Sequence, residues 1–208
     1  MLTCVDAEAD ERQSGVISPR PQAPQGLLSI LHAATMGISI LKEKQMQQDT
    51  RSTLDVIYEN WRGYDGRLQK CIAPLTNEQL LLQPAPHMWP LGQIMQHIIS
   101  VRAGWFSYTL QDADKVMDEY MLWGQRDSPE RSAVELVRGL DETWAFIESR
   151  LQRWTPADCA KTFPDEDNGQ IYEVSRSWVI YHVLEHDLHH GSEVSMILGM
   201  NGLQPLDI

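Results

Sequence analysis

Four of the seven histidines of this 208-residue chain fall within residues 182–190, in a segment whose apolar residues recur at helical spacing. These apolar residues are Val179, Ile180, Val183, Leu184, Leu188, Val194, Ile197 and Leu198. The pattern predicts a helix that begins near Ser175 and ends at Gly199. Residues four apart stack on one face of such a helix, so His182, His186 and His190 form a column. Two imidazoles one turn apart can bind one metal ion, because their nitrogens can converge at about 2.0–2.1 Å from zinc.

Three earlier segments carry the same helical period. The spacing predicts a first helix over 50–72 and a second from Pro90 to about Tyr108. A third is predicted to begin at Ser128-Pro129-Glu130, which read as N-cap, first helical residue and first-turn acid. The polar connections 111–127 and 157–170 are predicted to be irregular. Four long amphipathic helices, with no predicted strand and no internal repeat, favour an all-α four-helix bundle.

One globular domain is predicted over 46–208, because 208 residues suffice for one well-buried core and are short for two. Residues 1–45 are interpreted as an N-terminal extension, disordered or loosely helical, since their first half is rich in proline and polar residues. The apolar stretch 26–41 is shorter and more polar than a membrane span, which needs about 20 apolar residues. The leader before it is acidic, which argues against a secretory signal. We therefore expect no membrane association.

The formal net charge of −12 and the three cysteines limit the partners and the compartment. An acidic surface without a basic stripe disfavours phosphate backbones, so no nucleic-acid partner is expected. Cys4, Cys71 and Cys159 are widely spaced and form no C-x-x-C pair. A disulfide framework is therefore not expected, and the cytoplasm is the expected compartment. Each cysteine is interpreted as a small buried hydrophobe rather than as a nucleophile.

His97 lies within the apolar stripe of the second helix and is therefore predicted to face the core. Bundles build metal sites from inward side chains on facing helices. The candidate ligands are therefore His97, His186 and His190, an open set that leaves a fourth position for water or substrate. For His97 alone, a hydrogen-bonded core histidine is the simpler interpretation. The catalytic group is not assigned; it would be a water or a thiolate at the metal.

Three neighbouring residues are candidates for supporting roles around these ligands. His182 continues the column, but it lies a full turn away and cannot easily reach the same ion. Glu185 and Asp187 would orient ligand imidazoles through their second nitrogens, although a solvated helix face explains both acids equally well. His189 is interpreted as a surface or interface residue.

Residues 186–190 also fit the zinc-protease motif H-E-x-x-H, with Asp187 in place of the glutamate. The shorter side chain would hold an attacking water less well than glutamate does. No histidine follows His190 to complete a protease site. A protease is therefore the less favoured interpretation.

Four stretches of the chain carry a resemblance to a known family, namely WPLGQIMQH at 89–97, SRSW at 175–178, HVLEHDLHHGSE at 182–193 and LGMNGL at 198–203. Together with the features above, they resemble the DinB/YfiT-like family of small bacterial metalloproteins. The resemblance implies a four-helix bundle, often dimeric, with one divalent ion on His97, His186 and His190. Family members commonly carry an arginine after the last ligand. This chain has Gly191 there, so any anion contact of that arginine has no counterpart.

Characterised members of that family include transferases and isomerases that use low-molecular-weight thiols such as mycothiol or bacillithiol. The resemblance therefore implies a divalent-metal-dependent S-transferase that joins a small thiol to electrophilic small molecules. Two alternatives stay open, namely a hydrolase or isomerase that uses a metal-activated water, and a non-catalytic metal-binding stress-response module. Zinc is the expected ion, and imidazole ligands also suit nickel and iron, with manganese a further possibility. The expected partners are a small-molecule substrate and a second copy of the chain in a homodimer.

Overall fold

The computed structural model describes residues 52–125 and 127–207. The predicted extension 1–45 and the first residues of the predicted domain lie outside this range. The described part of the chain is mostly helical, as the sequence predicts. It contains no helix that is both long enough and apolar enough to cross a membrane.

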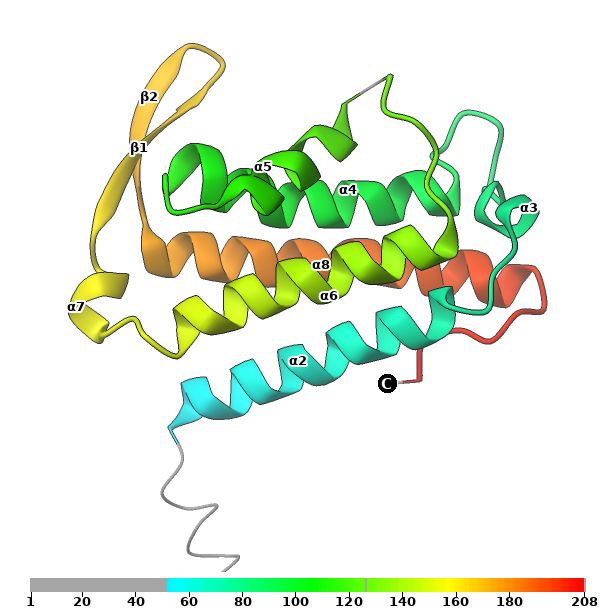
Figure 1. Ribbon diagram of the computed structural model, residues 1–208, viewed down its shortest axis with the longest axis horizontal. Helices are drawn as coiled ribbons and strands as arrows, with labels where there is room; N and C mark the ends of the chain where they lie inside the picture. The colour runs from blue at the N-terminus through cyan, green and yellow to red at the C-terminus, as the bar shows by residue number, and fades with distance from the viewer. Residues whose placement is uncertain (1–51, 126, 208) are drawn as a thin grey trace, which may run out of the picture. The chain divides into compact units, whose positions relative to one another are not determined.

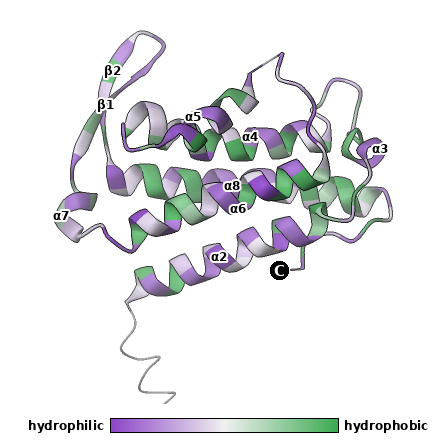
Figure 2. Cartoon of the chain, viewed as in Figure 1, coloured by the Kyte–Doolittle hydropathy of each residue, from purple (hydrophilic) through white to green (hydrophobic). Residues whose placement is uncertain are grey.

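Four helices of 14 residues or more form the frame of the described residues. They are α2 (Thr53–Ile72), α4 (Leu91–Gly104), α6 (Ala133–Leu151) and α8 (Arg176–Met200). Their axes run roughly alongside one another in Figure 1, and α4 contacts both α6 and α8 while α2 contacts α6. Hydrophobic and hydrophilic residues alternate along α2 and α6 in Figure 2, as expected for helices with one face in a core.

The N-caps of α8 and α6 show how well local sequence signals predict where a helix begins. α8 begins as predicted, with Ser175 as its N-cap. The third long helix, α6, begins after Ser132, so the predicted cap at Ser128 is wrong. Ser132 and Glu135 form a reciprocal capping box, in which each side chain accepts a backbone N–H from the other residue. Ser128 instead donates its backbone N–H to the carbonyl of Gln125 in a turn.

Short elements fill the connections between the long helices. They are α3 (Asn77–Leu80), the π-helical turn η1 (Trp105–Thr109), α5 (Lys115–Met121), the 3-10 turn η2 (Leu122–Gly124) and α7 (Pro156–Cys159). The second long helix therefore changes to a π-helical turn before Tyr108. The connection 111–127, predicted to be irregular, contains α5, whose N-terminal N–H groups are capped by the side chain of Asp114.

An antiparallel hairpin of β1 (Thr162–Asp167) and β2 (Gln170–Ser175) occupies much of the predicted irregular connection 157–170. The expectation of an all-α chain is therefore wrong in this segment. The two turn residues, Asn168 and Gly169, have φ angles of 50° and 80°. Asn-Gly is favoured at the two central positions of a hairpin turn because both require positive φ. The hairpin projects from one end of the helical frame in Figure 1.

A buried ion network ties three of the long helices together. Arg102 on α4 is fully buried and donates to Asp65 on α2 and to Asp187 on α8, with shortest N–O distances of 2.7 Å to each. The indole N–H of Trp61 on α2 also donates to Asp187, at 2.7 Å. Burial opposes the charge of the guanidinium, but the two carboxylates raise the pKa of Arg102 above its ordinary value. Arg102 therefore stays protonated and fixes α2 and α8 against α4.

On α8, Gly191 leaves room for the side chain of Tyr64, which reaches it from α2. A Cβ atom at this position would collide with the phenol ring of Tyr64, which is buried. Burial, with the nearby charge of Asp187 as a second cause, raises the pKa of Tyr64 to about 12. Glycine at this position therefore leaves space for the Tyr64 ring, and a larger residue would force that ring to move. The arginine common at this position in the family that the sequence resembles would not fit.

Candidate metal centre

α4 and α8 bring three histidine side chains together. His97 projects from α4, and His186 and His190 project one turn apart from α8. The Nε2 atoms of His97 and His186 lie 3.0 Å apart. One ring nitrogen of each of the three histidines lies within 4.8 Å of the other two. The structure therefore gathers the three residues that the sequence singles out as candidate ligands.

The spacing of these nitrogens suits a tetrahedral divalent ion. Zinc–nitrogen bonds of about 2.0–2.1 Å place neighbouring ligand atoms roughly 3.3 Å apart. The two Nε2 atoms of His97 and His186, at 3.0 Å, are slightly closer than this. The largest separation within the group is at most 4.8 Å, which is somewhat longer. Small side-chain rotations would therefore be enough to complete the coordination. Three imidazoles also leave a fourth position open, as in catalytic zinc sites.

Two of the three imidazoles are kept neutral by their surroundings. Burial, together with the neighbouring His190, lowers the pKa of His97 to about 4. The same two causes lower the pKa of His186 to about 3. Because a metal binds the neutral imidazole, both residues are ready to coordinate at pH 7 without first losing a proton.

Glu193 orients the third imidazole, a role that the sequence analysis does not assign. Its carboxylate lies 2.6 Å from Nδ1 of His190, so an N–H at Nδ1 can donate to the carboxylate, which leaves Nε2 as the nitrogen for a metal. Carboxylates commonly hold metal-binding histidines in this way. The signal was present in the sequence, since Glu193 follows His190 by three residues on one helix face. In contrast, Nδ1 of His186 is buried and has no hydrogen-bond partner among residues 52–125 and 127–207.

Two of the candidate supporting residues lie beside the cluster rather than in it. The ring of His182 stacks on Trp178 with an interplanar angle of 6°, and its centroid lies 6.3 Å from that of His186. Glu185 is exposed and lies near His182, with 3.8 Å between Oε2 and Nδ1. Neither residue is hydrogen-bonded to a candidate ligand in the described structure. His189 has a side chain that is 66% exposed, as a surface residue would.

Asp187 departs from the expectation that it orients an imidazole. Its carboxylate is fully buried and accepts hydrogen bonds from Arg102 and from Trp61. Burial raises the pKa of Asp187 while Arg102 opposes that rise. Asp187 therefore belongs to the ion network that joins the helices and is not hydrogen-bonded to a candidate ligand in the described residues.

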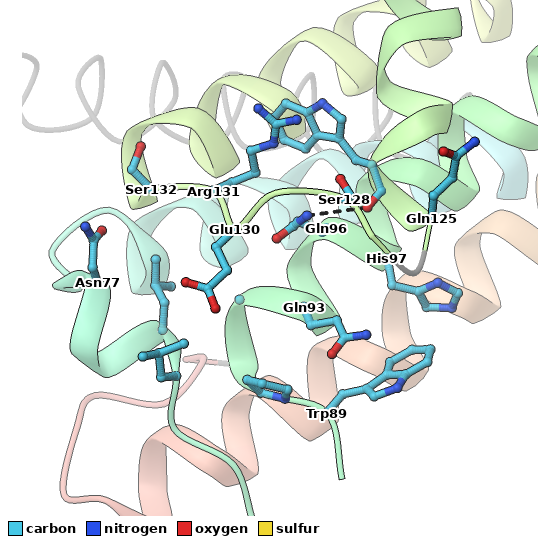
Figure 3. Close-up of a pocket in the computed structure, with 16 residues that line it drawn as sticks. Asn77, Trp89, Gln93, Gln96, His97, Gln125, Ser128, Glu130, Arg131 and Ser132 are labelled. Atoms are coloured by element: carbon cyan, nitrogen blue, oxygen red, sulfur yellow. Dashed lines mark hydrogen bonds between the residues drawn. The ribbon is translucent and has the colours of Figure 1, made fainter.

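Two cavities adjoin the histidine cluster. The first, which we call the His97 cavity, has a volume of about 390 Å³ and lies between α3, the start of α4 and residues 123–125 and 128–132 (Figure 3). His97 and Trp89 lie together at one end of it. The second, which we call the His190 cavity, has a volume of about 290 Å³ and is lined by His190 and Glu193. Small molecules can therefore approach the cluster from two sides.

The sequence of residues 63–194 matches the family model of the DinB superfamily. No curated protein matches the chain. The family match includes all three clustered histidines and the network residues Asp65, Arg102 and Asp187.

Solved structures with the same fold include a DinB-like protein from Bacillus cereus, with a TM-score of 0.57, 22% identity and coverage of 72% of this chain and 93% of that one. A conserved protein from Enterococcus faecalis gives a TM-score of 0.54 at 12% identity, covering 71% of this chain and 96% of that one. A DinB-like protein from Bacillus subtilis gives 0.52 at 12% identity, with 73% and 96% covered. At these identities the likeness concerns the fold.

Proposed function

The chain belongs to the DinB superfamily, and we propose that it is a metal-dependent enzyme in which His97, His186 and His190 bind one divalent ion. The observation that carries the proposal is the convergence of their ring nitrogens from two helices, within 4.8 Å of one another. The neutral state of His97 and His186 and the carboxylate behind His190 support it. Zinc is the proposed ion, held inside a four-helix bundle, with nickel, iron and manganese as alternatives.

The reaction that we propose is the transfer of a small thiol to an electrophilic small molecule. When bound, a zinc-type ion lowers the pKa of a thiol so that it reacts as a thiolate at neutral pH. The thiol sulfur forms a bond to an electrophilic carbon, the bond from that carbon to its leaving group breaks, and the leaving group departs with the proton of the thiol. Within the chain, Glu193 would accept a hydrogen bond from Nδ1 of His190 and so orient that imidazole, and the cavity walls would position the reactants.

A second candidate is hydrolysis or isomerisation by an activated water. It is favoured by the polar wall of the His97 cavity, where the side chains of Gln93 and Gln96 could position a water or a polar substrate (Figure 3). The two candidates differ in one requirement, since only the transferase consumes a thiol. Turnover without any thiol present would favour the hydrolase or isomerase.

Elemental analysis of untagged protein tests the metal site first. We expect one equivalent of metal per chain in the wild type and loss of that metal in His97→Ala and in His190→Ala. The matched control is His189→Ala, which removes an exposed imidazole next to His190 and should keep the metal. Metal retained in either ligand variant, or absent from the wild type even after incubation with zinc, would refute the proposed site.

Turnover is the second stage of the same test. Cysteine and 1-chloro-2,4-dinitrobenzene serve as a simple thiol and a simple electrophile, and formation of the thioether is followed by absorbance. His186→Ala should lose the metal and the enzymatic rate together. A metal-bound protein without turnover across thiols and electrophiles would leave a non-catalytic metal-binding module. Full activity in a metal-free variant would refute the proposed enzyme.

A further inference from the structure

Trp89 is shared by the two cavities that adjoin the histidine cluster. It lines the His97 cavity and also the His190 cavity. No histidine of the cluster lines both, because His97 is in the wall of the first and His190 in the wall of the second. The indole packs edge-on against the imidazole of His97, with 4.9 Å between ring centroids. Trp89 therefore lies where the two cavities meet at the histidine cluster.

Two features of the backbone restrain the position of Trp89. It precedes Pro90, whose ring fixes the backbone at the start of α4. The N–H of Leu91 donates to the carbonyl of Leu82 at 2.8 Å, which closes the loop that carries the indole. Although 45% of Trp89 is exposed, its backbone is therefore restrained at one end of α4. An exposed tryptophan held in this way is suited to separate two spaces.

The two cavities differ in chemistry. The His97 cavity has an apolar part of its wall, formed by Leu80, Leu81, Pro90 and Trp123, but most of its lining side chains are amides, hydroxyls or charged groups, among them Asn77, Gln93, Gln96, Gln125, Ser128, Glu130 and Arg131. The His190 cavity is bordered by the apolar side chains of Pro84, Met88, Ile94, Met196 and Ile197 and, beside Trp89, by the polar ones of His87, His190 and Glu193, so most of its wall is apolar. A polar, hydrogen-bonding molecule is favoured in the first because its groups find partners there. An apolar molecule is favoured in the second because it loses contact with water.

We infer that Trp89 divides the site into two substrate compartments, with a polar reactant in the His97 cavity and an apolar reactant in the His190 cavity. This inference rests on the proposed transferase function and extends it. The polar reactant is the thiol, and the apolar reactant is the electrophile, a hydrophobic molecule small enough for about 290 Å³. The carbon–sulfur bond forms at the histidine cluster, where the compartments meet, and the leaving group departs with the proton of the thiol. Trp89 is a specificity-determining residue that keeps each reactant on its own side.

Binding of toluene to the full chain tests the apolar compartment without requiring metal or turnover. Protein labelled with methyl-13C methionine reports the His190 cavity through Met88 and Met196, and the side-chain amides of Gln93 and Gln125 report the His97 cavity. In the wild type, toluene should shift the two methionine methyl signals and leave the two amides unchanged. In Trp89→Ala, where the partition is lost, toluene should shift both sets of signals. Toluene that shifts the amides in the wild type, or no methyl shift at all, would overturn the inference.

A charge placed in the apolar compartment provides the matched comparison. Met196 is 48% exposed and Met200, one turn further along α8, is 64% exposed, so both positions tolerate lysine. Met196→Lys should weaken toluene binding roughly tenfold or more, because an apolar site disfavours a charge. Met200→Lys is the control, since Met200 does not line the His190 cavity, and it should bind toluene as the wild type does. Equal affinities in the two variants would overturn the inference.

The kinetic consequence follows for the transferase. Met196→Lys should raise the KM for 1-chloro-2,4-dinitrobenzene and leave the KM for cysteine within twofold of the wild type, since only the apolar reactant meets Met196. A rise in both KM values would contradict separate compartments. If the toluene experiment fails, the inference about compartments is wrong, but the metal content and thiol dependence are not affected. If the protein contains no metal, the proposed function is wrong, but the place where toluene binds does not change. The two claims therefore fail in distinguishable ways.

Discussion

Replacing Arg102 by methionine is the most informative single change to the fold. Arg102 and Asp187 are both 0% exposed and Asp65 is 2% exposed, so the variant leaves two carboxylates in the core without their cation. Removing one partner of a buried ion pair typically costs about 3–5 kcal/mol. A single domain has only about 5–15 kcal/mol of stability, so Arg102→Met should remove a large share of it. With a urea m-value of about 2 kcal/mol/M, the unfolding midpoint should fall by roughly 2 M.

The pH dependence of this loss of stability shows whether it comes from unpaired buried carboxylates or from poorer packing. Burial already raises the pKa of Asp187, and without Arg102 no cation opposes that rise, so this pKa moves further above the unfolded value of about 4. The folded variant then binds more protons than its unfolded chain, so its stability falls as pH rises. The deficit relative to the wild type should therefore be smaller at pH 5 than at pH 8. A packing defect alone would give the same deficit at both values.

The double variant Arg102→Met/Asp187→Asn provides the control for this reasoning. It removes one stranded charge and keeps an acceptor for the indole N–H of Trp61. It should be more stable than Arg102→Met, although it carries one more substitution. The reasoning predicts that unpaired buried carboxylates cause the loss of stability. It would be refuted if the double variant were no more stable than the single one, or if Arg102→Met lost less than about 1 kcal/mol.

Three further predictions follow from the site and its packing. The pKa values of His97 and His186 lie at about 4 and 3, below the unfolded value of 6.5, so the metal-free protein should lose stability as pH falls from 7 to 5. In urea unfolding, the double variant His97→Gln/His186→Gln should lose less stability over the same pH range. Glu193→Gln should weaken zinc binding about 10–100-fold in a chelator competition, whereas Glu185→Gln should leave it unchanged. Gly191→Ala should destabilise the fold by about 1–3 kcal/mol, seen as a lower melting temperature, because its methyl group meets a buried tyrosine ring of α2.

The sequence predicts those features of the fold that depend on local spacing. The helix from Ser175 is correctly placed because its apolar period and its N-cap agree. The predicted start of α6 is wrong because two serines, Ser128 and Ser132, are both plausible N-caps. The proline after Ser128 favoured the first, but the capping box with Glu135 makes Ser132 the cap. The hairpin is missed because acidic residues in its strands hide the alternation, although Asn168-Gly169 marks the turn.

The candidate site shows the same division between local and tertiary information. The three clustered histidines follow from helical spacing and from the apolar stripe around His97. The orientation of Asp187 does not follow from spacing, because it depends on a hydrogen bond from Arg102, which lies on another helix. The separation of two cavities by Trp89 likewise depends on how the loop before α4 closes. Such facts arise from packing between segments that are distant in the sequence.

His186 and Asp187 are consecutive, and this links the buried network to the histidine cluster. Neighbouring residues on a helix point about 100° apart, so when Asp187 meets Arg102, His186 is turned toward His97 on α4. Rotating α8 by one residue would strand a carboxylate in the core, and the cost of a buried unpaired charge therefore fixes the direction of the imidazole. It follows that Arg102→Met/Asp187→Asn, although folded, should bind zinc more weakly than the wild type in a chelator competition. Unchanged zinc affinity would show that packing alone orients His186.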